Sequence, residues 1–135
     1  MARVLVVDDE PDIRILIKHL LSFAGHQVQL ASDGAEALIS LGQDPPDVMI
    51  LDVSMPVMDG FQVLEYMRAN PETAGIPVVL VTTLPPVKGE NAGRKMGVTH
   101  YLTKPWEAGT LETAVRVVLR ETQNRQALGQ NSGPA

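Results

Sequence analysis

Cysteine is absent from this chain of 135 residues, which excludes a disulfide framework, a thiolate metal site and a cysteine nucleophile. Runs of Lys or Arg are absent as well and the formal net charge is -5, whereas a protein that binds nucleic acid in bulk is usually basic. No stretch approaches the roughly 20 apolar residues of a membrane helix. The first apolar run stops at Asp8, too early for the core of a signal peptide. We therefore expect a soluble, cytoplasmic protein with no membrane insertion and no direct contact with nucleic acid.

The chain does contain short apolar runs that alternate with amphipathic segments. The runs are mostly β-branched and apolar at every position, which is typical of strands buried on both faces of a parallel sheet. The strongest runs span residues 4–7, 48–51 and 78–81, and weaker candidates span residues 27–31 and 100–102.

The segments between these runs predict helices. Apolar residues at positions 13, 16, 17, 20 and 21 follow helical spacing, which recurs at 111, 114, 115, 118 and 119. Shorter helices are expected at 34–41, at 60–69 after the cap candidate Asp59, and at 86–96, where Gly89 and Gly93 weaken the pattern. Residues 2–122 thus form one (βα)5 domain of the α/β class with helices on both faces of the sheet. Residues 123–135 form a polar tail that continues the last helix and then frays or is disordered.

Polar residues gather where the predicted strands end. In an open α/β sheet, ligands bind beyond the carboxyl ends of the strands. These ends carry Asp8, Asp9, Asp52, Thr82 and Lys104. Carboxylates this close repel one another unless a cation is present, and hard oxygen ligands suit Mg2+. Because a carboxylate can also attack phosphorus, the pattern predicts a Mg2+-dependent phosphoryl-transfer site.

Each of these residues alone has a simpler explanation. Asp8 and Asp9 suit the cap of a helix that starts near Pro11, Thr82 suits a strand end, and a single Lys104 is usually a solvated charge. The combined pattern favours a site, because the simpler explanation requires several independent coincidences at one edge of the sheet.

The combination resembles the receiver domains of two-component response regulators, of the stand-alone, single-domain type. The matching motifs are Asp8-Asp9, Leu51-Asp52 through Asp59-Gly60, Val81-Thr82 and Thr103-Lys104-Pro105, and the resemblance covers roughly residues 2–122. It implies a doubly wound, flavodoxin-like parallel sheet of five strands in the order 2-1-3-4-5.

The resemblance also implies the ligands of the site. Asp52 corresponds to the phosphoacceptor of the family, and Asp8 and Asp9 correspond to the acidic pair that holds Mg2+. Asp52 and the backbone carbonyl of Ser54 complete the protein ligands of the metal. Lys104, before a cis bond to Pro105, pairs with the phosphoryl group.

A switch is implied by two further matches. Thr82 corresponds to the hydroxyl that moves to a phosphoryl oxygen, and Tyr101 to the aromatic side chain that swings inward when Thr82 moves. The change alters the face made by the fourth helix, the fifth strand and the fifth helix, which then binds an unknown downstream protein or a second copy of the chain.

The phosphoryl donor implied by the resemblance is a phosphohistidine of a sensor histidine kinase or a histidine phosphotransfer protein. Such a domain is a signalling switch rather than an enzyme, because it catalyses only its own phosphoryl transfer and autodephosphorylation.

Three features depart from the usual family pattern. Thr83 is bulkier than the small residue common after Thr82, and Leu84 replaces a polar residue that orients water, so we expect slow loss of the phosphoryl group. Leu84-Pro85-Pro86 stiffens the following loop. Trp106 replaces a common phenylalanine near Lys104, where its fluorescence is expected to report on the site.

Three other functions fit the sequence less well. A haloacid-dehalogenase-like phosphatase needs a second aspartate where this chain has Ser54, and a flavodoxin-like electron carrier needs a hydroxyl- and glycine-rich loop where it has Asp8-Asp9-Glu10. A degenerate receiver binds partners without phosphorylation, which the intact set of acidic residues, Thr82 and Lys104 disfavours. Glycine-rich nucleotide loops are also missing, which argues against nucleotide binding.

Overall fold

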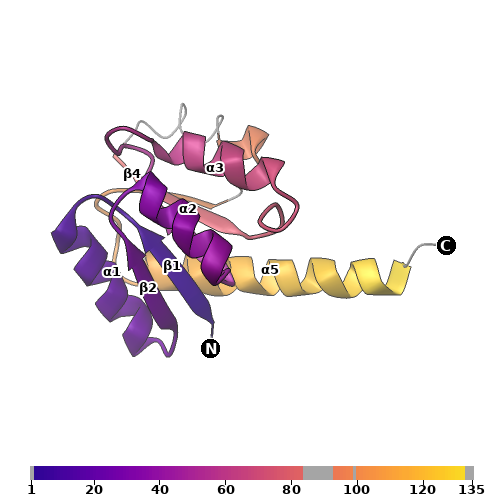
Figure 1. The fold of residues 1–135 in the computed structure, drawn as a ribbon. Coiled ribbons are helices and arrows are strands. Elements are labelled where there is room, and N and C mark those ends of the chain that lie inside the picture. Colours follow the sequence, from indigo (N-terminus) through magenta and orange to yellow (C-terminus); the bar gives the residue numbers. More distant parts are fainter. Residues whose placement is uncertain (1, 84–92, 99, 133–135) are drawn as a thin grey trace.

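The fold is a parallel sheet between two layers of helices, as the computed structural model of residues 2–83, 93–98 and 100–132 shows (Figure 1). Side chains are described as far as residue 127. The elements are β1 (Arg3–Val7), α1 (Pro11–Phe23), β2 (Gln27–Ala31), α2 (Gly34–Gln43), β3 (Val48–Leu51), α3 (Gly60–Ala69), β4 (Val78–Thr82), β5 (His100–Thr103) and α5 (Thr110–Ser132). The predicted (βα)5 order and all five expected strands are confirmed for the described residues.

The five strands form one sheet in the order β2-β1-β3-β4-β5, and every neighbouring pair is parallel. The register places Val7 of β1 beside Leu51 of β3, and Leu51 beside Leu80 of β4. The polar residues that follow β1 and β3 must therefore emerge side by side, because neighbouring parallel strands end at the same edge. The expected strand order is confirmed.

The strands are apolar at every position because both faces of the sheet are covered. Leu5 and Val7 of β1 pack into one core with α2 and α3, whereas Val4 and Val6 pack into a second core with α1 and α5. On the helices, Ile17 and Leu21 of α1 are buried in the second core, as their spacing predicts. Figure 1 shows α2 and α3 on one face of the sheet.

The last helix is longer than its apolar stripe. α5 runs from Thr110 to Ser132, so the backbone of residues 123–132 continues the last helix. This part extends beyond the sheet (Figure 1). None of the helices in the described ranges combines the length and the apolar character needed to span a membrane.

The fourth predicted helix falls largely outside the described residues. Residues 93–95 are helical, but residues 84–92 are not described. The expectations for Leu84 and for Leu84-Pro85-Pro86 therefore lie outside the described residues.

Candidate functional site

The site lies at the carboxyl edge of the sheet. Backbone hydrogen bonds there extend the pairing between neighbouring strands by one residue beyond the strand ends. The N–H of Asp8 donates to the carbonyl of Ala31 at 3.2 Å, and that of Asp52 donates to the carbonyl of Val7 at 2.9 Å. The N–H of Lys104 donates to the carbonyl of Thr82 at 2.9 Å. The backbone thus fixes where Asp8, Asp52 and Lys104 leave the sheet.

The ammonium group of Lys104 joins three carboxylates. Its Nζ lies 2.7 Å from Asp8 Oδ2, 3.2 Å from Asp52 Oδ2 and 3.1 Å from Glu10 Oε1. The side chains of Lys104, Asp8 and Asp52 are only 7%, 2% and 3% exposed, whereas Glu10 is exposed. A charge-assisted pair in such a buried place is held strongly, because water competes poorly for either partner.

Burial and charge act in opposite directions on these groups. Burial raises the pKa of Asp52 above its ordinary value, and the charge of Asp8 adds to this, although the nearby charge of Lys104 opposes it. Burial by itself lowers the pKa of Lys104, but the hydrogen bond to Asp8 and the charge of Asp52 outweigh it and raise that pKa. The site therefore contains more negative charge than one ammonium group neutralises.

Short turns fix the two buried aspartates. Asp8 Oδ1 accepts the N–H of Glu10 at 2.9 Å, and Asp52 Oδ1 accepts the N–H of Ser54 at 3.1 Å. Helix α1 is capped at Glu10 without a side-chain hydrogen bond, and Pro11 occupies its first turn. The alternative in which Asp8 and Asp9 cap α1 is therefore wrong, and the carboxylate of Asp8 contacts Lys104 instead.

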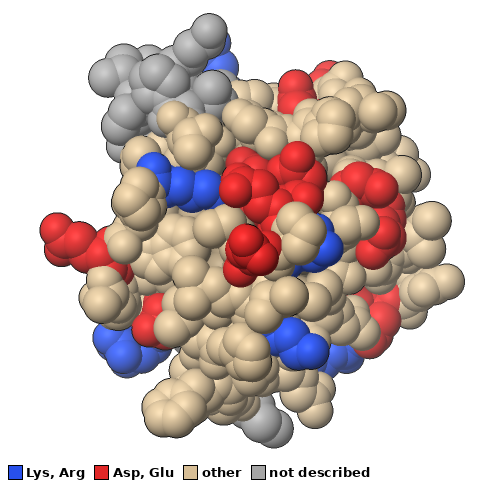
Figure 2. Space-filling view, turned by 90° about the vertical axis from the view of Figure 1, so that its left-hand side faces the viewer, with Lys and Arg blue, Asp and Glu red and all other residues tan. Residues whose placement is uncertain are grey.

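Four carboxylates can share one cation. Asp8, Asp9, Glu10 and Asp52 each offer one oxygen, and these oxygens all lie within 4.8 Å of one another. Figure 2 looks onto this end of the molecule and shows Asp and Glu side chains gathered in a patch beside a basic side chain. Hard oxygen donors at this density fit Mg2+, which binds through a few carboxylates and keeps several waters. The donor set therefore fits the expected metal.

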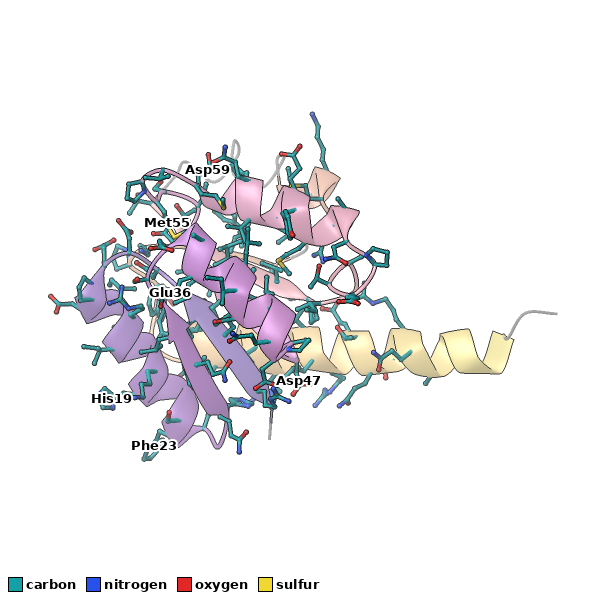
Figure 3. The ribbon with its side chains drawn as sticks, in the orientation of Figure 1. His19, Phe23, Glu36, Asp47, Met55 and Asp59 are labelled. Atoms are coloured by element: carbon teal, nitrogen blue, oxygen red, sulfur yellow. The ribbon has the colours of Figure 1, made fainter. Side chains whose placement is uncertain are left out.

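Helix α3 approaches the back of the site very closely. Asp59 caps α3 with a reciprocal pair of bonds to Gln62, each of 2.9 Å, and Figure 3 shows it at the start of that helix. The next residue, Gly60, donates to the carbonyl of Val53 at 2.9 Å. A Cβ on Gly60 would overlap the backbone carbonyl of Asp52 and lie 2.8 Å from the Cα of Val53. Gly60 thus belongs to a close approach of two backbone segments.

The structure also describes the remaining predicted residues. Thr82 is fully buried at the end of β4, and Tyr101 of β5 is partly buried against the core on the α2 and α3 side. Ser54 is exposed, and its backbone contacts Asp52 as described. Trp106 lies with Lys104 and Thr83 around a cavity of about 530 Å³ next to α1. The peptide bond between Lys104 and Pro105 is cis, as the resemblance implied.

Two contributors were not assigned from the sequence. Glu10 joins both the carboxylate cluster and the Lys104 contacts, and Arg14 of α1 donates through Nη1 to the carbonyl of Asp8 at 2.7 Å. The direct succession Asp8-Asp9-Glu10 was a usable signal for Glu10. Nothing in the sequence distinguishes Arg14 from any solvated arginine.

Comparison with known proteins gives one consistent result. The family model described as "Response regulator receiver domain" matches residues 4–116. The chain is 40% identical over 120 residues to "Probable transcriptional regulator ycf27" of Guillardia theta, covering 89% of this chain and 46% of that protein. It is 37% identical over 119 residues to "Protein PilH" of Pseudomonas aeruginosa, covering 88% and 98%.

A solved structure agrees with these matches. The chemotaxis protein CheY4 of Vibrio cholerae superposes with a TM-score of 0.82 at 37% identity, covering 87% of this chain and 98% of that one. The chain nevertheless spans only about half the length of several curated relatives, between 46% and 51% for three of them.

Proposed function

The chain belongs to the response regulator receiver domain family, and from this membership we propose that it is a phosphorylation-activated signalling switch with Asp52 as phosphoacceptor. The observation that carries the proposal is the contact between Lys104 Nζ and Asp52 Oδ2 at 3.2 Å within a cluster of four carboxylates. In the proposal, Asp52 is the nucleophile, Lys104 is the cation that faces the phosphoryl group, and the neighbouring carboxylates are the metal ligands. Phosphoryl transfer needs these parts, because its catalysis is mostly positioning and charge stabilisation.

In the proposed reaction, a carboxylate oxygen of Asp52 attacks the phosphorus of a phosphohistidine. An O–P bond forms, the P–N bond breaks, and its electron pair returns to the imidazole nitrogen of the donor. Ser54 fixes the orientation of the carboxylate through its N–H, and Lys104 faces the oxygens on which negative charge accumulates. The low exposure of Asp52 keeps bulk water away from the acyl phosphate that results.

We propose Asp8, Asp9 and Asp52 as the side-chain ligands of Mg2+, with the backbone carbonyl of Ser54. The carboxylate of Glu10 lies close enough to contribute directly or through water. A bound Mg2+ would supply charge neutralisation for the carboxylates and for the incoming phosphoryl oxygens. A bound metal would neutralise the carboxylates with which Lys104 pairs when no metal is present. The ammonium group of Lys104 would then be available to the phosphoryl group.

The proposed switch connects this centre to the surface. Thr82 is buried at the end of β4, and Tyr101 lies on the neighbouring strand β5, where it pairs in register with Leu80. We propose that the Thr82 hydroxyl contacts the phosphoryl group and that Tyr101 follows it inward. The face around β5 and α5 would change as a result, for a downstream protein or a second copy of the chain.

The proposed donors are a sensor histidine kinase or a histidine phosphotransfer protein. The test of the switch is intact mass spectrometry after incubation with acetyl phosphate, with and without Mg2+, on the wild type and on Asp52→Asn. We expect a gain of one phosphoryl group that requires Mg2+ and is lost in Asp52→Asn. If the chain acts without phosphorylation, its mass should not increase with acetyl phosphate or with a phosphohistidine donor. That result would overturn the proposal.

A further inference from the structure

A second cavity lies at the opposite edge of the sheet from the carboxylates. Its volume is about 840 Å³, within the usual range for a pocket that binds a small molecule. It lies between α3, the start of β4, the segment before β5 and the part of α5 that extends beyond the sheet. Figure 1 shows this end of α5 projecting past the strands. The proposed phosphorylation chemistry uses none of the residues that line it.

One of the residues that line the cavity is a rigidly held arginine. Arg68 donates through Nε to the carbonyl of Met96 at 2.8 Å and through Nη1 to those of Ala74 and Ile76 at 2.9 and 2.8 Å. These three bonds fix the orientation of the guanidinium group. They leave Nη2, which carries two N–H donors, for another acceptor.

Positive charge predominates in this cavity. Arg68, Lys95 and Arg125 line it together with a single acidic residue, Glu65, although the whole chain has a net charge of -5. Within the described residues, none of the three cations forms an ion pair with a carboxylate. Burial, and then the charge of Arg125, lower the pKa of Arg68, as expected for cations that repel one another across a shared space.

The cavity also offers apolar and neutral polar surface. Its wall includes Ile76 and Val118, which are buried in the two cores, and Met96. Thr122 accepts a hydrogen bond from Arg125 Nη2 at 3.3 Å, which holds that arginine along α5 and beside the cavity. A ligand with an anionic group and an apolar or aromatic body would use both kinds of surface.

We propose that this cavity binds a small organic phosphate, with its phosphoryl groups between Arg68 and Arg125 and its body against the apolar wall. The two N–H donors of Arg68 Nη2 and the guanidinium group of Arg125 would bind different phosphate oxygens, so the site needs no glycine-rich loop. The ligand removes the repulsion between the two arginines. It also joins α3 to the projecting part of α5, because Arg68 belongs to the first helix and Arg125 to the second.

The test is isothermal titration calorimetry at low ionic strength with EDTA present, using ADP, pyrophosphate and adenosine as probes. ADP represents a phosphate with an aromatic body. Pyrophosphate lacks the aromatic body, and adenosine lacks the phosphoryl groups. We expect ADP to bind more tightly than pyrophosphate and adenosine to show no binding. Chelation of metal keeps the probes away from the carboxylate cluster.

Two substitutions on α5 locate the binding. Arg125→Ala should weaken ADP binding at least tenfold, whereas Arg120→Ala removes an exposed arginine of the same helix that does not line the cavity and should change it less than twofold. Arg68 is not the first choice for substitution, because its loss also removes three backbone contacts. The proposal is overturned if ADP does not bind at millimolar concentration, if pyrophosphate binds equally well, or if the two variants weaken ADP binding equally.

Discussion

Lys104 Nζ lies 2.7 Å from Asp8 Oδ2, and both side chains are almost fully buried. The ammonium group thus holds the buried carboxylates of Asp8 and Asp52 together when no metal is bound. Removing it leaves buried carboxylates without their cation, and breaking a buried pair in this way is costly.

Lys104→Met is therefore expected to lower the free energy of unfolding in metal-free buffer by about 3 kcal/mol. The pKa of Lys104 is raised above its usual 10.5, so its contribution is complete below pH 10.5 and is lost only as the pH rises through the higher folded value. Urea unfolding at pH 7.5 and pH 9 should give the same difference. Lys18→Met, which removes an exposed lysine of α1, is the control and should stay close to the wild type. Equal effects of the two substitutions would contradict the role of Lys104.

Asp52→Asn should have the opposite effect on stability in the absence of metal. Burial raises the pKa of Asp52, so its carboxylate form is disfavoured in the folded protein at neutral pH. We expect the variant to unfold with a free energy about 1 kcal/mol higher than the wild type in EDTA at pH 7.

The sign of the pH dependence follows from the raised pKa of Asp52. As the pH falls through the folded pKa of Asp52, the carboxyl group of the wild type becomes protonated and no longer lowers the free energy of unfolding. The difference in free energy of unfolding between Asp52→Asn and the wild type should therefore shrink toward acid pH. Saturating Mg2+ should also remove it, because only the wild type keeps the full ligand set. An advantage that stayed constant with both pH and Mg2+ would show that the gain has another cause.

Gly60→Ala is expected to lower the free energy of unfolding by about 2 kcal/mol or more, because the added methyl group overlaps the backbone of Asp52. It should also slow phosphorylation, since the strand end that carries the phosphoacceptor must shift. Gly42→Ala is the matched control: Gly42 lies in α2 with nothing within 4 Å of the added Cβ, and the substitution should stabilise by about 0.5–1 kcal/mol. Chemical denaturation and intact mass after acetyl phosphate measure both effects. If both variants were as stable as the wild type, the close approach of α3 to the Asp52 backbone would not restrict position 60 to glycine.

Val57→Gly is expected to stabilise the loop between β3 and α3. Val57 is fully exposed and has a φ of 67°, a left-handed conformation that disfavours a β-branched residue. Relief of this strain should raise the free energy of unfolding by about 1 kcal/mol. Part of this gain is lost, because glycine is more flexible than valine in the unfolded chain. Thermal unfolding should place Val57→Gly above Val57→Ala, which keeps the strain. The reverse order would argue against strain at this position.

Much of the fold was predictable because the signals are local. The runs at 4–7, 48–51 and 78–81 are apolar on both faces, and the structure buries both faces. The strand ends differ by a residue at Arg3, Thr82 and Thr103, because the parallel ladder continues for as long as neighbouring backbones pair. How far α5 continues was not predictable, since residues 123–132 have no apolar stripe that indicates where the helix ends.

The site was predictable as a set of strand ends but not as a set of contacts. Asp8, Asp9, Asp52 and Lys104 meet as the order of the strands requires. The contribution of Glu10 and the bond from Arg14 to the Asp8 carbonyl depend on side-chain directions at the start of α1, which no sequence pattern specifies. The steric demand at Gly60 depends on how closely α3 approaches β3, which also becomes visible only in three dimensions.

The most direct measurement for the central claim locates the phosphoryl group. The protein is phosphorylated with acetyl phosphate and Mg2+, reduced with borohydride, which converts an aspartyl phosphate to homoserine, and mapped by peptide mass spectrometry. We expect homoserine at position 52 alone, and none when Mg2+ is omitted. Homoserine at position 8 or 9, or a phosphoryl group found on Thr82 instead, would contradict the assignment of Asp52 as the phosphoacceptor.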